Sequence, residues 1–172
     1  TTDDGVGVIV TNNSTITTLT NNGTITGTAA NNGYGVFNDG STLTTLFNSG
    51  TITGTATGNQ GHGVFVENTA TTTTLTNTGT ITGTAATNAF DIRVDATSNL
   101  VNFNNLQSGL TYDARLPSNY STIIRNSDNY GSVTFSNPAA SAGGDTVYTP
   151  FAGSTDAAVY IKGGTYSNVM TG

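Results

Sequence analysis

Short runs of alternating hydrophobic and polar residues fill the first half of the chain and recur at a fixed spacing. The run Gly-Thr-Ile-Thr-Gly-Thr-Ala occurs at 23–29, 50–56 and 79–85, and a Gly-Val run occurs at 7–10, 35–38 and 63–66. Successive copies lie 27 to 29 residues apart. Such alternation predicts β-strands, and a repeat of this length predicts a solenoid in which each repeat forms one turn.

Each repeat contains three predicted strands. The first places these residues inward: Val8, Val36, Val64 and Ile92, then Val10, Asn38, Val66 and Val94. In the second, Ile16 and Leu19 are three residues apart, which predicts a bend or bulge. The third places Ile25, Ile52 and Ile81 inward. No helical period and no proline before Pro117 interrupt the pattern, so the predicted fold is an all-β parallel β-helix with three strands per turn.

The corners of the predicted solenoid are rich in Asn and Gly. Asn-Gly, Asn-Ser-Gly and Asn-Thr-Gly corners are predicted to supply the positive φ angles that tight bends need. Asn21, Asn48 and Asn77 recur at one corner and are predicted to stack as an amide ladder. The small Gly and Ala of the repeated run are interpreted as residues for tight turns.

The repeat decays after residue 90, and the chain is predicted to end in a cap. Residues 90–114 are interpreted as a worn fourth turn, with Leu110-Thr111-Tyr112 as its third strand. We predict β-helix repeats of about 28 residues over 1–114 and a C-terminal capping region over 115–172. A cap is expected because an open solenoid end exposes unpaired strand edges. Strands are predicted there at 121–125, 132–136, 146–149 and 157–162.

Composition narrows the classes of partner. The 172 residues include 10 acidic and only four basic side chains, for a net charge of −6, and no cysteine. The missing basic patch disfavours nucleic-acid binding and attraction to anionic membranes. No apolar run approaches the roughly 20 residues of a membrane span, so no membrane insertion by this segment is expected. No signal peptide is recognised, so the sequence is interpreted as a mature piece or an excised segment.

Two stretches resemble the passenger region of bacterial autotransporters, the type V secretion proteins. One is the repeated Leu-Thr-Asn-x-Gly-Thr-Ile-Thr-Gly-Thr-Ala run with its Gly-Val-Phe partner, and the other comprises 109–112, 116–120, 130–131 and 164–172. The resemblance implies a right-handed β-helix that is secreted across the outer membrane and displayed at the bacterial cell surface. The family includes adhesins, aggregation factors, toxins and enzymes on the same stalk, and the resemblance is strongest to adhesin-like members, so a role in attachment or biofilm formation is expected. The chain departs from a complete family member because no signal peptide and no translocating barrel are recognised.

Acidic residues recur at the corner after the first strand of each repeat. Asp39, Glu67 and Asp95 are 28 residues apart. Stacked carboxylates repel one another unless a cation or a base such as Arg93 intervenes, so one interpretation is a Ca²⁺ site. The other is a row of solvated turn residues, since the Gly-Gly-x-Gly-x-Asp repeat of calcium-loaded β-rolls is absent. No other cofactor is expected.

Two outward rows are candidate contact surfaces. Thr24, Thr26, Thr51, Thr53, Thr80 and Thr82 form a Thr-x-Thr array similar to the ice-binding faces of β-solenoid antifreeze proteins. The alternative is that threonine simply suits an exposed strand. Ile9, Phe37 and Phe65 should also point outward, which indicates either a lateral contact or cover by a neighbouring loop. His62 falls in a column with Val6, Tyr34 and Phe90 and is interpreted as a member of that stack.

No catalytic constellation is found, so an enzyme is not expected. The predicted function is a structural or adhesive segment of a secreted, surface-displayed β-helix protein that binds a host or surface ligand or a copy of itself. One alternative is a subunit of an extracellular fibre that assembles by end-to-end stacking, because open heterologous contacts make filaments. Ice binding through the Thr-x-Thr rows is a further alternative.

Overall fold

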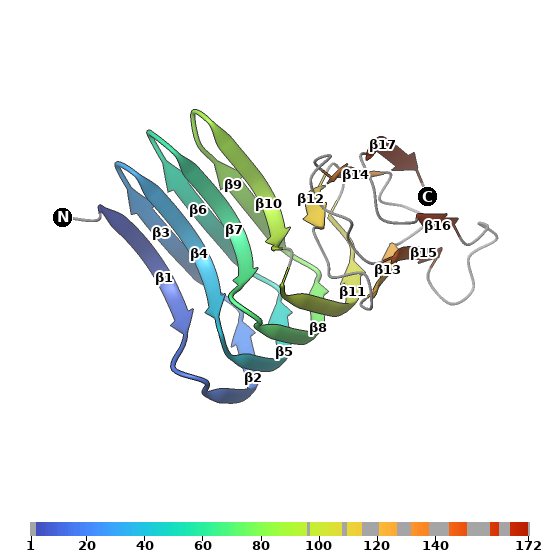
Figure 1. Cartoon of the computed structure of the whole chain (residues 1–172), viewed down its shortest axis with the longest axis horizontal. Coiled ribbons are helices and arrows are strands. Elements are labelled where there is room, and N and C mark those ends of the chain that lie inside the picture. Colours follow the sequence, from blue (N-terminus) through green and yellow to red (C-terminus); the bar gives the residue numbers. More distant parts are fainter. Residues whose placement is uncertain are drawn as a thin grey trace.

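The chain forms an all-β parallel solenoid of about four turns, with no helix in the part of the chain that the structure describes. In this computed structural model the described residues are 3–95, 97–107 and 110–114, followed by the backbone of five strands between 121 and 171. Figure 1 shows the turns stacked side by side from the N-terminal end. The predicted all-β parallel fold is therefore confirmed.

The strands are short and follow the predicted repeats. The first three turns are β1 Asp4–Val10, β2 Thr15–Asn21, β3 Thr24–Ala29, β4 Asn32–Asp39, β5 Thr42–Asn48, β6 Thr51–Ala56, β7 Gln60–Glu67, β8 Thr71–Asn77 and β9 Thr80–Thr84. The later strands are β10 Asn88–Val94, β11 Asn99–Asn105, β12 Leu110–Ala114, β13 Ser121–Asn126, β14 Ser132–Asn137, β15 Asp145–Pro150, β16 Val159–Ile161 and β17 Tyr166–Thr171. They build a first sheet in the order β1-β4-β7-β10-β12-β14-β17, a second in the order β16-β15-β13-β11-β8-β5-β2 and a third of β3-β6-β9.

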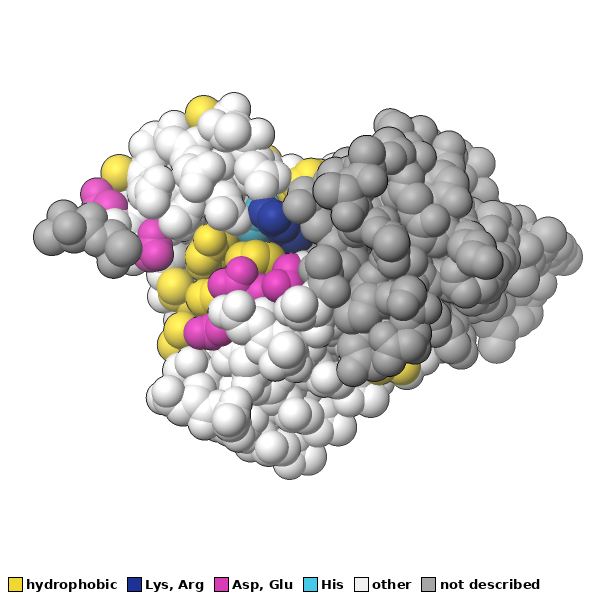
Figure 2. Space-filling view, in the orientation of Figure 1, with side chains coloured by type: hydrophobic (Ala, Val, Ile, Leu, Met, Phe, Trp, Pro, Cys, Tyr) yellow, Lys and Arg dark blue, Asp and Glu magenta, His cyan; other side chains and the backbone are white. Residues whose placement is uncertain are grey.

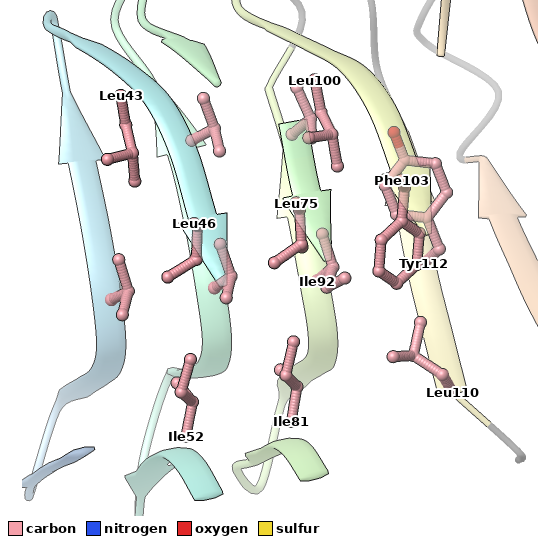
Figure 3. Packing of buried hydrophobic residues seen from close by; sticks show 14 of the residues in the cluster. Leu43, Leu46, Ile52, Leu75, Ile81, Ile92, Leu100, Phe103, Leu110 and Tyr112 are labelled. Carbon is pink, nitrogen blue, oxygen red and sulfur yellow. The ribbon is translucent and has the colours of Figure 1, made fainter. Parts of the chain in front are cut away.

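The register stacks equivalent residues of successive turns, which confirms the predicted inward columns. Val36 pairs with Val64 and Val64 with Ile92, and all three side chains are buried. In the second sheet Leu46, Leu75 and Phe103 form another buried column (Figure 3). Full burial of one such side chain contributes about 1.5–3 kcal/mol, so the stack, rather than any single turn, supplies the core.

Glycine in the repeated run is required by sheet-to-sheet contact rather than by a turn. A Cβ on Gly54 would lie 1.8 Å from the carbonyl oxygen of His62, and one on Gly33 would lie 2.0 Å from that of Thr55. At these positions the first and third sheets pack backbone against backbone. The interpretation of this glycine as a turn residue was therefore wrong, because the residue lies inside a strand and its neighbour across the core leaves no room for a side chain.

The predicted asparagine ladder is present and one rung longer than predicted. Nδ2 of Asn21 donates to Oδ1 of Asn48 at 2.7 Å, Asn48 donates to Asn77 at 2.8 Å, and Asn77 donates to Asn105 at 3.0 Å. The ladder needs no positive φ: Oδ1 of Asn21 accepts the N–H of Gly23 and so makes the bend with its side chain. Among the described residues the positive φ angles lie instead between the first and second sheets, at Asn12, Asn13, Gly40, Asn68 and Thr69.

The third sheet ends after β9, and the prediction that Leu110-Thr111-Tyr112 extends it was wrong. Tyr112 pairs with Ile92, so β12 begins a new turn of the first sheet after a step of only 20 residues. Among the described strands, none pairs with β9 on the side away from β6. The side-chain amide of Gln107 takes that place, accepting from the N–H of Ile81 at 2.7 Å and donating to its carbonyl at 2.9 Å. Two peptide groups that would otherwise lie unpaired at a strand edge are thereby satisfied.

Parallel pairing continues beyond residue 114. β13 pairs with β11, β15 with β13, and β14 with β12, all in parallel. The last two strands reverse this direction, because β17 pairs with β14 and β16 with β15 in antiparallel fashion. Strands thus occur in all four segments predicted between 121 and 162, whereas the division at 114/115 stays a prediction.

Candidate binding groove on the first sheet

The first three strands of the first sheet bend at a glycine, which is Gly7 in β1, Gly35 in β4 and Gly63 in β7. Gly35 and Val36 both face inward, the glycine against Ile52 and the valine in the core. As a result Tyr34 and Phe37, which would lie on opposite faces of a regular strand, share the outer face with ring centroids 4.9 Å apart. A side chain at position 35 would meet the Ile52 methyl group at 2.5 Å, so glycine permits the bend.

Because each copy bends at the same point, the outer face of the first sheet is hollowed along the solenoid. Two columns of side chains line the hollow: Val6, Tyr34, His62 and Phe90, and beside them Ile9, Phe37, Phe65 and Arg93. We call this surface the outer groove. Figure 2 shows hydrophobic side chains on its floor, acidic side chains along one margin, and a basic side chain and the histidine at its far end.

Aromatic rings stack along both columns. Phe37 and Phe65 are nearly parallel, with centroids 5.4 Å apart and an interplanar angle of 8°. In the neighbouring column His62 lies between Tyr34 and Phe90, at 5.8 and 5.9 Å, as the sequence predicted. Ile9 is 50% exposed, whereas Phe65 is only 3% exposed and contacts the rings of Tyr34 and His62. The structure thus places Ile9, Phe37 and Phe65 on the outer face, and their contact role stays a prediction.

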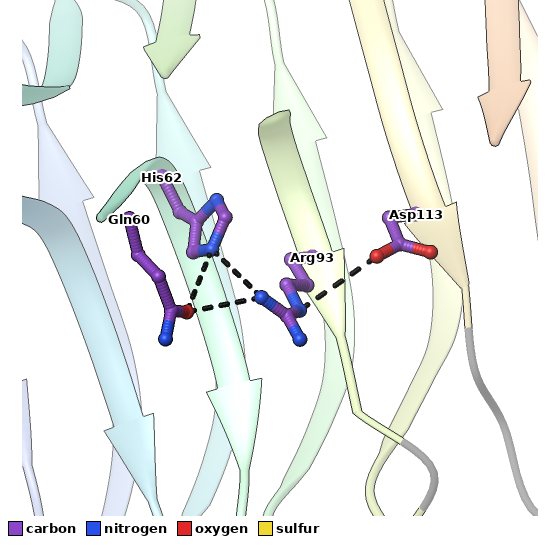
Figure 4. A network of polar contacts seen from close by, with 4 residues as sticks. All are labelled: Gln60, His62, Arg93 and Asp113. Atoms are coloured by element: carbon purple, nitrogen blue, oxygen red, sulfur yellow. Dashed lines mark hydrogen bonds and ion pairs between the residues drawn. The ribbon is translucent and has the colours of Figure 1, made fainter. Parts of the chain in front are cut away.

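Arg93 closes the described groove through a polar network (Figure 4). Its guanidinium lies 5.2 Å from the centre of the Phe65 ring, donates to Oε1 of Gln60 at 3.0 Å and contacts Nε2 of His62 at 3.2 Å. Nε of Arg93 lies 3.7 Å from Oδ2 of the fully buried Asp113. Nε2 of His62 also lies 3.2 Å from Oε1 of Gln60, so the imidazole, the amide and the guanidinium form one polar cluster.

The acidic row lies along one margin of the outer groove. Asn68 links its ends, because Nδ2 donates to Asp39 at 2.7 Å and the backbone N–H donates to Asp95 at 3.3 Å. Burial raises the pKa of the Glu67 carboxyl, and the charges of Asp95 and Asp39 raise it further. Burial, with the charges of Glu67 and Asp4, also raises the pKa of Tyr34 to about 12. The negative potential of the row therefore extends over the aromatic floor.

The acidic row offers no assembled metal site in the described residues. No three acidic or histidine side chains among them converge closely enough to hold a metal ion. Both oxygens of Asp39 accept hydrogen bonds, from Asn68 and from Thr11 at 3.4 Å, and both oxygens of Asp95 accept from Thr97. The base expected to intervene, Arg93, pairs instead with Asp113. The calcium hypothesis for Asp39, Glu67 and Asp95 stays a prediction.

The threonine rows occupy the outer face of the third sheet. Thr24 pairs with Thr51 and Thr51 with Thr80, and Thr26, Thr53 and Thr82 form a second row in register. The threonines alternate with the inward isoleucines and are partly or fully exposed. This placement matches the predicted direction of the side chains, and their role stays a prediction.

Sequence reasoning missed three residues that shape the groove and its end. Gln60 and Asp113 hold Arg93, and Asp91 occupies the position of the bend glycines Gly35 and Gly63. The Asp91 carboxylate accepts the N–H groups of Gly83 at 3.0 Å and Thr111 at 2.8 Å. The only sign of this in the sequence is that aspartate replaces glycine at this position of the repeat. The replacement occurs in the turn where the third sheet ends, and the end of that sheet leaves space for the Asp91 side chain.

The fold and the groove define a parallel β-solenoid protein with a hollowed, aromatic-lined outer face. No protein-family model, curated protein or solved structure matches the chain in the three comparisons made. Among the described residues there is also no helix with the length and apolar character to cross a membrane.

Proposed function

We propose that the chain is a structural and adhesive segment of a bacterial protein displayed at the cell surface. In this role the solenoid is a rod whose repeated outer faces attach to a surface ligand or to another copy of the protein. The observation that supports the proposal most directly is the outer groove. Aromatic columns aligned along several turns provide an elongated contact surface, and no catalytic role is proposed.

The interior of the solenoid suits a load-bearing rod. The asparagine ladder runs through four turns, and Asn48, Asn77 and Asn105 are fully buried. Asn48 and Asn77 each accept from the turn before and donate to the turn after, so one turn cannot separate from the next without leaving buried polar groups unpaired. This arrangement supports a role in which length and resistance to local opening matter.

Display of the chain on the surface of a non-adherent bacterium tests the proposal. We expect the displaying cells to attach to surfaces or to aggregate more than cells that display an unrelated solenoid of similar length. The Phe37→Ser variant should reduce this gain, whereas Phe47→Ser, on the outer face of the second sheet, should leave it unchanged. Equal attachment by cells that display the chain and by control cells would reject the adhesive role.

End-to-end stacking into a fibre remains the alternative reading of the same fold. The edge of β9 argues against it, because Gln107 and Asp91 already occupy the hydrogen-bonding groups of Ile81 and Gly83 that a further strand would need. Electron microscopy of the purified chain distinguishes the two: separate short rods support a stalk segment, and long filaments support the fibre.

Ice binding is a third candidate, favoured only by the two threonine rows in register on the third sheet. The rows span three strands, which makes a small face. Normal growth of ice crystals in a solution of the purified chain would remove this candidate. A change in crystal shape that disappears in Thr53→Tyr would support it.

A further inference from the structure

We propose that the outer groove binds a basic amphipathic peptide segment of a partner protein. This inference deepens the proposed adhesive role and rests on it, because it names the chemical class of partner that the groove would hold. Three features of the groove select that class: an apolar floor, an acidic margin, and an arginine that already lies across the floor.

The floor is accessible to an apolar ligand at the N-terminal turns. Ile9, in the first turn, is 50% exposed and is the one large hydrophobic side chain in the described residues with that degree of exposure. Phe37 lies beside it in register and is half-buried. Tyr34 and Phe65 complete the floor beneath them. Burial of such a strip against a ligand's aliphatic side chains is favourable at about 25 cal/mol per Å² of apolar surface removed from water.

The acidic margin of the outer groove favours a ligand with a basic side chain. Asp39, Glu67 and Asp95 line it, and burial, together with the charges of Asp95 and Asp39, raises the pKa of Glu67. A lysine or arginine side chain beside Glu67 would relieve that repulsion. Arg93, the one basic residue with a described side chain, is paired with Asp113. A second copy of this chain, with its net charge of −6, has the wrong charge for the margin.

Arg93 shows how a basic side chain fits this surface. It occupies the fourth-turn position of the column formed by Ile9, Phe37 and Phe65. Its guanidinium covers the Phe65 ring at 5.2 Å while polar atoms of Gln60 and Asp113 receive the charged head. Long basic side chains commonly lay their aliphatic stems on apolar surface in this way. A ligand's basic residue would repeat the arrangement over the first two turns, with its stem on Ile9 and Phe37 and its head towards Asp39 and Glu67.

Binding of short labelled peptides to the purified chain tests the inference. The probe alternates lysine and leucine, and two matched peptides replace either every lysine by glutamate or every leucine by serine. We expect the lysine–leucine peptide to bind, and each matched peptide to bind about fivefold more weakly or worse, because each lacks one half of the interaction. Equal binding of the glutamate peptide, or of the serine peptide, would overturn the proposal.

Paired variants locate the site. Glu67→Gln should weaken binding of the lysine–leucine peptide about two- to fivefold, whereas Asp3→Asn, with the same change in charge, should have no effect. Phe37→Ser should weaken it about fivefold or more, unlike Phe47→Ser on the second sheet. Ile9→Ser is a further variant in the floor of the groove. Because Ile9 is half exposed, this substitution should leave the fold intact. Equal effects of groove and control variants would overturn the proposal.

The peptide assay and the attachment assay separate the two proposals. If peptides bind the groove but displaying cells do not attach, the ligand class stands and the adhesive role fails. If cells attach and the Phe37→Ser variant abolishes attachment, but no basic peptide binds, the ligand class proposed for the groove is wrong.

Discussion

The side-chain amide of Asn38 donates a hydrogen bond to Oγ1 of Thr72 at 3.2 Å inside the solenoid, where both residues are 1% exposed. In the neighbouring turns the position of Asn38 holds Val10 and Val66, and that of Thr72 holds Leu43 and Leu100. Two polar residues thus replace two apolar ones at a single point in the core. Nδ2 of Asn38 also donates to the carbonyl of Thr71 at 3.1 Å, whereas its Oδ1 is buried and accepts no hydrogen bond.

This pairing predicts strong coupling in a double-mutant cycle. Asn38→Val and Thr72→Leu should each destabilise the fold by about 1–2 kcal/mol, because each leaves the remaining polar group buried with fewer partners. The double variant restores the apolar pair of the adjacent turns and should be close to the parent, which gives a coupling energy above about 1 kcal/mol. Chemical unfolding measures all four stabilities. Additive effects would contradict the pairing.

The side chain of Gln107 should stabilise the edge of the third sheet. Gln107→Leu removes the acceptor for the N–H of Ile81, and we expect a loss of about 1–3 kcal/mol in the free energy of unfolding. Hydrogen exchange should show faster exchange at Ile81. Asn59→Leu, an exposed control, should change the free energy of unfolding by no more than about 0.5 kcal/mol and should leave the exchange rate at Ile81 unchanged. Unaltered exchange at Ile81 in the Gln107 variant would contradict the capping role.

Two glycines, one in the first copy of the repeated run and one in the second, should respond very differently to alanine. A Cβ on Gly54 would lie 1.8 Å from the His62 carbonyl oxygen, whereas nothing lies within 4 Å of one on Gly23. Gly54→Ala should therefore cost about 3 kcal/mol or more, because backbone on both sides must move. Gly23→Ala should stay within about 0.5 kcal/mol of the parent. Thermal melts of both variants check this prediction, and similar melting temperatures would contradict it.

The raised pKa of Glu67 implies that the stability of the fold depends on pH. A carboxyl whose pKa is higher in the folded than in the unfolded state binds more protons when folded, so stability falls as the pH rises through that interval. Glu67→Gln should therefore raise the melting temperature at neutral pH. The gain should vanish below the unfolded pKa of about 4.3, where both chains are uncharged at this position. A gain that persists in acid would implicate something other than the charge.

Removal of divalent cations tests the calcium hypothesis. Because the oxygens of Asp39 and Asp95 already accept hydrogen bonds from Asn68, Thr11 and Thr97, we expect the same melting temperature with added Ca²⁺ and with EDTA. Asp95→Asn should not change this comparison. A melting temperature that rises with Ca²⁺ in the parent and not in Asp95→Asn would instead establish a site at the corner.

The sequence was sufficient to predict the members of each of the two side-chain columns that line the outer groove. The 28-residue step placed Phe37 above Phe65 and Tyr34 beside His62, and the alternation placed the former pair on the outer face. What the sequence did not reveal is that the two columns touch. That contact depends on a bend at Gly35, which brings residues three apart onto one face. Phe65 points outward as well, yet it is only 3% exposed and lies against the rings of Tyr34 and His62.

By itself the sequence determined the repeating unit, the inward columns and the asparagine ladder, because each depends on a local pattern repeated at nearly constant spacing. Only the tertiary structure decided where the repeat stops and how the sheets approach one another. The fourth turn is shortened, so Tyr112 meets Ile92 after 20 residues and Asp113 reaches Arg93. Gly54 packs against the His62 carbonyl of the next turn, and Gln107 pairs with Ile81. The contacts of Tyr112, Asp113 and Gln107 join strands at irregular separations, because they are set by the space that the shortened turn leaves. The glycine contact does recur, at Gly27 with Tyr34 and at Gly83 with Phe90, but a local pattern does not show which backbone lies opposite the glycine.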